Sequence, residues 1–282
     1  MLQTPPGQSS PSAQHLSSPP NGYPVKSPST LYHACVELEK KVEDLLASKP
    51  DTAVLQNVQS RVREAVSVIE EAFERYTPEQ ISLSYNGGKD CLVLLVIILA
   101  CLSRRNAQTR KDTSHSEPPD GFPKKLQAIY IVSEHPFSEI DDFVGSSSAK
   151  YNLEIARYES GMKQALEAYL ADRPNIKAIF VGTRRTDPHG EKLTHFDRTD
   201  SGWPDFMRIH PVIDWHYAEI WAFIRRLGIP YCSLYDQGYT SLGGTQDTLP
   251  NPHLKKQDGS GEGFLPAYVL TGDHEERLGR EK

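Results

Sequence analysis

Apolar residues recur at helical spacing in the part of the chain that follows residue 30. Positions three or four residues apart predict helices over residues 31–47 and 52–76, with Val58, Val62 and Ile69 on one face of the second. Beyond residue 80 the pattern changes to short apolar runs separated by longer periodic stretches. We therefore expect two N-terminal helices that pack one face against a core built from the rest of the chain.

The remainder of the chain alternates predicted strands with predicted helices. The strands are expected over residues 81–84, 126–133, 153–158 and 176–183. The helices are expected over residues 89–105, 137–151, 161–171 and 214–227, the last with Asp214 as its N-cap. This order predicts an α/β fold, a mostly parallel twisted sheet with helices on both faces. In such sheets ligands bind beyond the carboxyl ends of the strands.

Composition separates an N-terminal tail from one domain. Residues 1–30 are rich in Pro, Ser, Gln and Gly and carry almost no charge, which predicts a disordered tail. Residues 31–282 are sufficient for a single catalytic α/β domain, made of N-terminal helices over 31–76 and a core with a C-terminal segment over 80–282. Polar residues 106–125 and 255–263 are expected to form surface loops.

Charge and cysteine usage exclude several classes of protein. A net charge of −6 and a pI near 5.9 provide no positive field for a polyanion, so no nucleic acid is expected as a partner. The longest apolar run, residues 91–102, is too short to span a bilayer, and no secretory signal pattern precedes it. The four cysteines form no Cys-x-x-Cys pair, which argues against a zinc site or a disulfide framework. We expect a cytoplasmic protein with no membrane partner.

A glycine-containing loop joins the first predicted strand to an apolar helix. It consists of Ser84, Tyr85, Asn86, Gly87, Gly88, Lys89, Asp90 and Cys91. At such a junction the backbone N–H groups and the helix dipole attract phosphate, and glycine lets the main chain approach the anion. The segment does not match a Walker A loop. A tight turn without a ligand is the alternative, but Lys89 and Asp90 at the helix start favour phosphate binding.

Two polar segments follow the strand predicted over residues 176–183. The first contains Gly182, Arg184, Arg185 and Asp187 at a carboxyl end, where guanidinium groups suit phosphate recognition, although solvated surface charge would look the same. The second, residues 199–208, has neither helical nor strand periodicity. Its polar and aromatic residues are Asp200, Ser201, Gly202, Trp203, Asp205 and Arg208. Its tryptophan can stack on a flavin or adenine ring, or can simply pin a loop to the core.

The order of these motifs resembles a known family. The loop at 84–91 is similar to the PP-loop of the PAPS reductase and ATP pyrophosphatase superfamily. Together with the segments at 182–188, 199–208, 234–243 and 275–280, it resembles the eukaryotic, fungal-type FAD synthetases. The resemblance implies Mg²⁺-dependent adenylyl transfer from ATP to FMN, which gives FAD and pyrophosphate. A PAPS reductase-like sulfonucleotide enzyme or another PP-loop ATP pyrophosphatase is the alternative.

The same resemblance implies roles for individual residues. The ATP-binding residues would be Ser84, Tyr85, Asn86, Gly87, Gly88 and Lys89. The flavin-nucleotide-binding residues would be Gly182, Arg184, Arg185, Asp200, Ser201, Gly202, Trp203, Asp205 and Arg208. The catalytic residues would be Asp90, Asp187, Arg277 and Arg280. The loop positions of Asp90 and Asp187 place both carboxylates near the phosphates, where each either binds a metal or orients a substrate, and Asp90 is the candidate metal ligand. We expect small-molecule substrates and a monomer, with client flavoproteins as further candidate partners.

Overall fold

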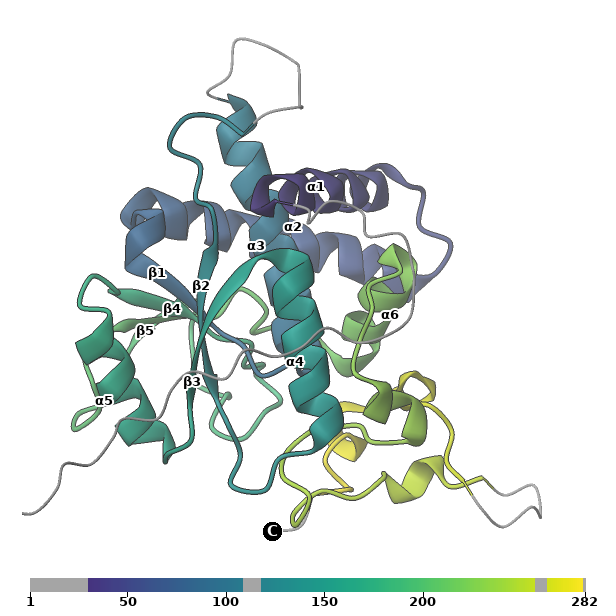
Figure 1. Ribbon diagram of the computed structural model, residues 1–282. Coiled ribbons are helices and arrows are strands. Elements are labelled where there is room, and N and C mark those ends of the chain that lie inside the picture. The colour runs from purple at the N-terminus through teal and green to yellow at the C-terminus, as the bar shows by residue number, and fades with distance from the viewer. Residues whose placement is uncertain (1–29, 109–117, 257–262, 281–282) are drawn as a thin grey trace, which may run out of the picture.

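The computed structural model of the chain describes residues 30–108, 118–256 and 263–280 (Figure 1). The helices are α1 (Leu31–Ala47), α2 (Ala53–Arg75), α3 (Lys89–Gln108), α4 (Ser138–Tyr151), α5 (Met162–Asp172) and α6 (Tyr217–Leu227). The strands are β1 (Ile81–Ser84), β2 (Leu126–Ile131), β3 (Leu153–Tyr158), β4 (Ala178–Phe180), β5 (Phe196–Arg198) and β6 (Met207–Ile209). The short 3-10 helices are η1 (Pro78–Gln80), η2 (Ser233–Gln237), η3 (Pro252–Leu254), η4 (Ala267–Val269) and η5 (Asp273–Glu275).

The strands form one sheet in the order β3-β2-β1-β4-β6-β5. All neighbouring pairs are parallel except β5 and β6, which form an antiparallel hairpin at one edge. Because the chain proceeds from β1 toward β2 and β3 on one side, and later from β4 toward β6 on the other, the strand order reverses between β1 and β4. This confirms the predicted α/β fold and places a switch point at the carboxyl ends of β1 and β4.

Helix α3 is the centre of the hydrophobic core. Every residue from Cys91 to Leu102 is buried, because α1 packs along α3 and α2 and α6 contact it as well (Figure 1). A smaller cluster on the other face of the sheet joins α5 to β2 and β4, through residues such as Tyr169, Ile129 and Ile179. The apolar run of α3 is therefore a core helix covered by the two N-terminal helices.

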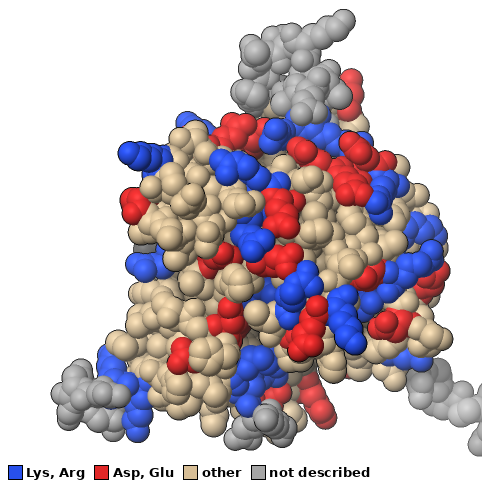
Figure 2. Space-filling model, turned by 180° about the vertical axis from the view of Figure 1, so that it is seen from behind, with Lys and Arg blue, Asp and Glu red and all other residues tan. Residues whose placement is uncertain are grey.

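The surface shows no extended region of one charge on the face that Figure 2 presents. Basic and acidic side chains are interleaved there. Within the described ranges, none of the helices has both the length and the apolar character that crossing a membrane requires.

The predicted start of the last helix was wrong. Helix α6 begins at Tyr217, and Asp214 is not its N-cap, because the Asp214 carboxylate pairs with Arg185 Nε at 2.5 Å. The N-terminus is instead capped by two acids. Glu219 accepts a hydrogen bond from the backbone N–H of His216 at 2.8 Å, and Asp273 accepts one from the N–H of Tyr217 at 2.7 Å.

Two strands were missed by the sequence prediction. β5 and β6 have three residues each, too few to show a period, and β6 begins inside the segment 199–208 that was predicted as irregular. Helix α3 continues to Gln108, into the predicted loop 106–125. Residues 109–117 and 257–262 of the two predicted loops lie outside the described residues. Of the predicted tail, only Thr30 is described, and it is the N-cap of α1.

Replacing Leu38, which is buried in α1 against the core, should test whether the N-terminal helices belong to one cooperative domain. Leu38→Ala is expected to lower the free energy of unfolding by about 2–5 kcal/mol in a single transition, because it leaves a cavity in the shared core. Denaturant unfolding followed by circular dichroism measures this. The control is Val54→Ala on the exposed side of α2, expected to change stability by no more than about 0.5 kcal/mol. A separate early transition for α1 would contradict a single domain.

Candidate active site

A cavity of about 400 Å³ opens at the carboxyl ends of β1 and β4, beside the first turn of α3. Five separate segments form its wall: the loop after β1, Met162 at the start of α5, the residues after β4, residues 235–242 and the C-terminal residues 276–280. This is the switch point of the sheet, where α/β proteins bind their ligands. The loop predicted to bind phosphate, residues 84–91, which we call the phosphate loop, therefore meets the C-terminal residues 276–280 at one site.

The loop after β1 presents some of its residues to the cavity and buries others. Ser84, Asn86 and Gly88 line the cavity. Tyr85 is buried behind the loop, where its hydroxyl donates a hydrogen bond to Ser147 Oγ at 2.9 Å. Gly87 has a positive φ of 73° and packs against Val144 of α4. Among the predicted ATP-binding residues, Tyr85 and Gly87 therefore shape the loop from behind.

Gly182 brings the end of β4 into contact with the start of α3. A Cβ atom at this position would lie 2.8 Å from the backbone nitrogen of Cys91 and 3.0 Å from its Cα, both closer than van der Waals contact allows. Only glycine fits here without moving the helix. Gly182 lines the cavity next to the phosphate loop, so it forms part of the cavity floor between β4 and α3.

Four charged residues form a closed ring of ion pairs at the cavity wall, which we call the charge ring: Lys89, Asp90, Arg184 and Glu276. Three of them are buried, and Asp90 is 21% exposed. Asp90 pairs with Lys89 Nζ through Oδ2 and with Arg184 Nε through Oδ1, each at 2.9 Å. Glu276 pairs with Lys89 through Oε1 and with Arg184 through Oε2. The exposed fraction of the Lys89 side chain is 2%, and that of Arg184 is 0%.

The pairing in the charge ring overcomes the cost of burial. Burial alone would raise the pKa of Asp90, but the positive charges of Arg184 and Lys89 outweigh burial and lower it. Burial alone would lower the pKa of Lys89, but the carboxylates of Asp90 and Glu276 raise it. The pKa shifts of Asp90 and Lys89 therefore both favour the charged form of the group.

Asp187 and Arg185, both predicted for the site, lie in different places. Asp187 lines the cavity, and its Oδ2 accepts a hydrogen bond from the backbone N–H of Arg184 at 2.8 Å. Arg185 does not line it, because its guanidinium group pairs with Asp214 and donates to the backbone carbonyls of Glu191 and Leu193. Of the two consecutive arginines, one is thus buried in the charge ring and the other is directed to the loop after β4.

Both predicted C-terminal arginines reach the cavity wall. Arg280 is fixed, because it pairs with Asp247 at 3.0 Å and donates to the carbonyl of Leu242 at 3.0 Å. Arg277 is exposed, and within the described residues no ion pair engages its guanidinium group. The segment is a 3-10 helix followed by turns. Gly279 lets it approach residue Leu249, since a Cβ there would lie 2.2 Å from the Leu249 carbonyl oxygen.

The predicted flavin-binding residues of segment 199–208 lie apart from this cavity. The register pairs Met207 with Ala178 and Ile209 with Phe180, so the turn of the β5–β6 hairpin lies beyond the amino ends of the parallel strands. Trp203 is 40% exposed at this turn. The polar residues partly bind each other there: Asp205 pairs with Arg198, and Arg208 contacts Asp200 at 3.5 Å. These residues are thus grouped at the amino ends of the parallel strands, whereas the phosphate loop lies at the carboxyl ends: Asp200, Ser201, Gly202 and Trp203.

Sequence reasoning missed Glu276 and Tyr235. Glu276 completes the charge ring, and the Tyr235 hydroxyl accepts a hydrogen bond from the backbone N–H of Lys89 at 2.8 Å. Both residues belong to motifs that were recognised, the Glu-Arg-x-Gly-Arg end and the segment 234–243. The motif Glu-Arg-x-Gly-Arg begins at Glu276 and so could have separated it from its neighbour Glu275, which pairs with His253.

A second cavity of about 660 Å³ lies at the carboxyl ends of β2 and β3. Its wall includes Val132, Pro136 and Arg157. Met162, at the start of α5, lines both cavities, so the two are adjacent. The site as a whole extends along the carboxyl edge of the sheet from β4 to β3.

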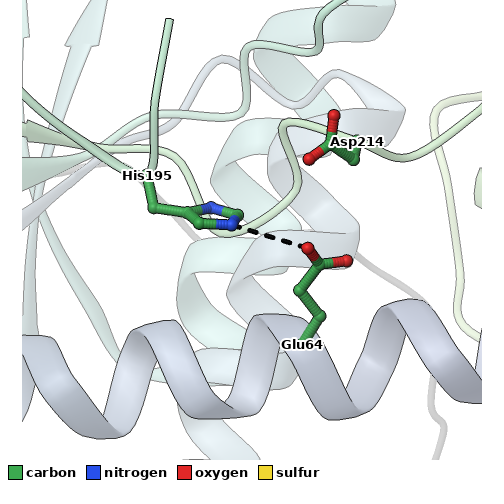
Figure 3. Close-up of side chains that lie close together, drawn as sticks. All are labelled: Glu64, His195 and Asp214. Atoms are coloured by element: carbon green, nitrogen blue, oxygen red, sulfur yellow. Dashed lines mark ion pairs between the residues drawn. The ribbon is translucent and has the colours of Figure 1, made fainter.

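A cluster of Glu64, His195 and Asp214 has the composition of a metal site, with ligand atoms within 4.8 Å of one another (Figure 3). Its carboxylates are already paired with cations. Arg61 lies 2.9 Å from Glu64, and Arg185 lies 2.5 Å from Asp214. His195 lies 3.5 Å from Glu64. We therefore interpret the cluster as an ion-pair network that joins α2 to the loop after β4.

Comparison with known proteins supplies the family. A family model of the phosphoadenosine phosphosulfate reductase domain matches residues 80–170 and 157–250. A probable FAD synthase of Schizosaccharomyces pombe is 39% identical over 247 residues, which cover 86% of this chain and 89% of the relative.

Solved structures agree with this relationship. The crystal structure of Candida glabrata FMN adenylyltransferase in complex with FAD and inorganic pyrophosphate has a TM-score of 0.81 and 30% sequence identity, and the match covers 89% of this chain and 99% of that one. Yeast FAD synthetase in complex with FAD has a TM-score of 0.80 and 31% identity, over 90% of this chain and 100% of that one. With a phosphoadenosine phosphosulfate reductase-type domain and this degree of identity, the chain belongs to the FAD synthase family.

Proposed function

We propose that this chain transfers the adenylyl group of ATP to FMN and releases FAD and pyrophosphate. The observation that carries the proposal is the meeting of the phosphate loop with two arginines from the C-terminus, in a chain of the FAD synthase family. The reaction forms a bond between an FMN phosphate oxygen and the α-phosphorus of ATP, and it breaks the bond from that phosphorus to the bridging oxygen of pyrophosphate. The FMN phosphate is already an anion, so the site needs no general base.

The main task of the site is electrostatic, since two polyanions must meet and the departing pyrophosphate gains charge. Asn86 and Gly88 of the loop line the cavity at the positive end of α3, where the ATP phosphates would bind. Arg277 is exposed on the same wall, and Arg280 is held beside it. We assign these two arginines to the charge that develops on the pyrophosphate.

Magnesium fits this site through Asp187. Mg²⁺ is usually held by one or two carboxylates together with substrate phosphates. Asp90, Glu276 and Asp187 all line the cavity, but both carboxylate oxygens of Asp90 and of Glu276 have cationic partners in the charge ring. Among the described residues, the carboxylate of Asp187 has a single cationic partner, Arg184 at 3.4 Å. We therefore propose Asp187 as the metal-holding carboxylate, and a bound Mg²⁺ would neutralise phosphate charge there.

The adenosine part of ATP fits the second cavity. Its wall combines the apolar side chains of Val132, Pro136 and Met162 with polar groups at the ends of β2 and β3, a combination suited to a base and a ribose. We also propose that the chain acts as a monomer.

The flavin ring is proposed to bind at the β5–β6 hairpin, because the resemblance to the family assigns residues 199–208 to flavin binding. The exposed Trp203 and the neighbouring Arg208 would then contact the ring end, as the resemblance to the family implies.

A sulfonucleotide reductase is a poorer explanation of the site. Such an enzyme needs a reactive thiol, and all four cysteines of the chain are buried. Burial raises the pKa of the Cys91 thiol to about 12 and also raises the pKa of Cys232, so neither provides a thiolate near neutral pH.

FMN and not riboflavin is expected to be the acceptor. The cavity arginines and the phosphate loop act on phosphate, so an acceptor without its own phosphate loses both the nucleophile and charged hydrogen bonds, each worth about 1.5–3 kcal/mol. Incubation with ATP, Mg²⁺ and either flavin, followed by chromatographic separation of the products, checks this. Equal consumption of riboflavin and FMN would contradict the proposal.

Arg277→Ala is expected to lower kcat roughly ten-fold or more at saturating ATP, because the variant loses a charge that acts on the leaving pyrophosphate. Steady-state kinetics at saturating FMN measures the effect. The matched control is Arg226→Ala, which removes an exposed arginine of α6 outside the cavity and should change kcat by no more than about two-fold. An unchanged kcat for Arg277→Ala would remove the C-terminus from the mechanism.

Trp203→Ala is expected to raise the KM for FMN about two- to ten-fold while the KM for ATP stays unchanged, because only the flavin ring would stack on this side chain. Leu265→Ala, which removes another exposed apolar side chain, is the control and should leave both KM values unchanged. If Trp203→Ala also leaves the FMN KM unchanged, the ring binds elsewhere.

A further inference from the structure

Glu276 connects the C-terminal segment to the phosphate loop. Lys89 and Asp90 of the charge ring begin α3, and Arg184 follows β4, so Glu276 is the one member that comes from the C-terminal segment. Its carboxylate contacts both cations, and its exposed fraction is 6%. The neighbouring Arg277 faces the cavity.

The backbone around Glu276 is fixed as well. The Thr240 hydroxyl donates a hydrogen bond to the Glu276 carbonyl. The side-chain amide of Asn251 donates to Thr240 Oγ1 at 2.9 Å and to the carbonyl of Glu275 at 2.8 Å. Thr240 and Asn251 are buried, so these hydrogen bonds are shielded from water. Both the backbone and the side chain of Glu276 are thus held in place, and this fixes the direction of the residues that follow it.

We propose that Glu276 is a positioning residue that anchors the C-terminal segment to the charge ring and thereby places Arg277 and Arg280 on the cavity wall. The proposal rests on the proposed function for the role of the two arginines, but the anchoring itself does not. Glu276 is at the cavity wall, but both of its oxygens are engaged by Lys89 and Arg184, so we assign it no direct part in the reaction. It acts through the arginines that follow it.

The charge of Glu276 is necessary for this role. Without it, the charge ring contains two buried cations that share the one carboxylate of Asp90, so one positive charge is uncompensated within the ring. The C-terminal segment loses its two ion pairs through Glu276 and keeps the longer contact of Asp273 with Arg184, at 3.8 Å. Arg280 keeps its contacts with Asp247 and Leu242, so the freedom gained should be greatest at residues 276–279.

The kinetic test compares Glu276→Gln with Glu275→Gln. Glu275 is the matched control, since it is the adjacent acid and pairs with the exposed His253 at 2.8 Å outside the charge ring. Glu276→Gln is expected to lower kcat at least ten-fold with KM values for FMN and ATP changed less than three-fold, while Glu275→Gln keeps kcat within two-fold. Assays are run far below the melting temperature of each variant. A kcat within two-fold for Glu276→Gln overturns the proposal.

A double variant separates positioning from a general loss of stability. If Glu276 acts through Arg277, then Glu276→Gln combined with Arg277→Ala should be no more than about two-fold worse than the more damaging single variant. If the two losses multiply, Glu276 acts independently of Arg277 and the proposal is overturned.

Hydrogen–deuterium exchange provides a readout that does not need activity. In the substrate-free protein, Glu276→Gln should accelerate amide exchange at residues 276–280 at least ten-fold and leave β1, β4 and α3 unchanged. If Glu276→Gln accelerates exchange at these residues but the wild-type protein makes no FAD, then the anchoring holds and the proposed function fails. Unchanged exchange at residues 276–280 overturns the anchoring.

Glu276→Asp keeps the test decisive if the glutamine variant does not fold. The shorter side chain retains the charge but cannot hold Lys89 and Arg184 as closely, so a kcat between those of the wild type and Arg277→Ala is expected, with faster exchange at residues 276–280. Wild-type kcat and exchange in Glu276→Asp would overturn the proposal.

Discussion

The charge ring of Lys89, Asp90, Arg184 and Glu276 is the interaction on which the site depends. It joins the start of α3, the segment after β4 and the C-terminal segment, which are far apart in the sequence. Buried charges are tolerated only when they are paired, and here each of the four has two partners of opposite sign in the ring. Because the ring is neutral and closed, it can lie directly behind the phosphate loop and fix the position of the cavity wall.

The rest of the fold supports this arrangement by fixing the position of α3. The helix is apolar on every side, and α1, α2 and α6 surround it, so its N-terminus has a fixed position at the carboxyl edge of the sheet. Gly182 allows β4 to reach that N-terminus at backbone contact distance. The cavity is therefore formed by rigid elements below and by the C-terminal segment on one side, an arrangement that suits a reaction controlled by electrostatic complementarity.

The four arginines predicted for the C-terminus and the segment after β4 differ in role because their side chains differ in burial and in partners. Arg184 is fully buried and structural in the described arrangement, Arg185 serves the loop after β4, and Arg277 and Arg280 provide the charge on the cavity wall. A basic pair in a sequence is easily assigned to phosphate as a unit. In this protein the two consecutive side chains point to different environments, and the cations available to a ligand come from the other end of the chain.

The order of elements from α1 to β4, the parallel sheet and the family could be predicted from the sequence, because they depend on local periodicity and on contiguous motifs. Pairing between distant residues could not. Asp214 looks like an N-cap, but Arg185 takes its carboxylate and Asp273 caps the helix instead. Glu276 and Glu275 are adjacent acids, and only the packing of the C-terminal segment buries one and pairs the other with His253. The sequence by itself determined which chemical groups the site has, whereas tertiary structure decided which of them are neutralised by partners and which remain available to a ligand, since that depends on charges brought together by the fold.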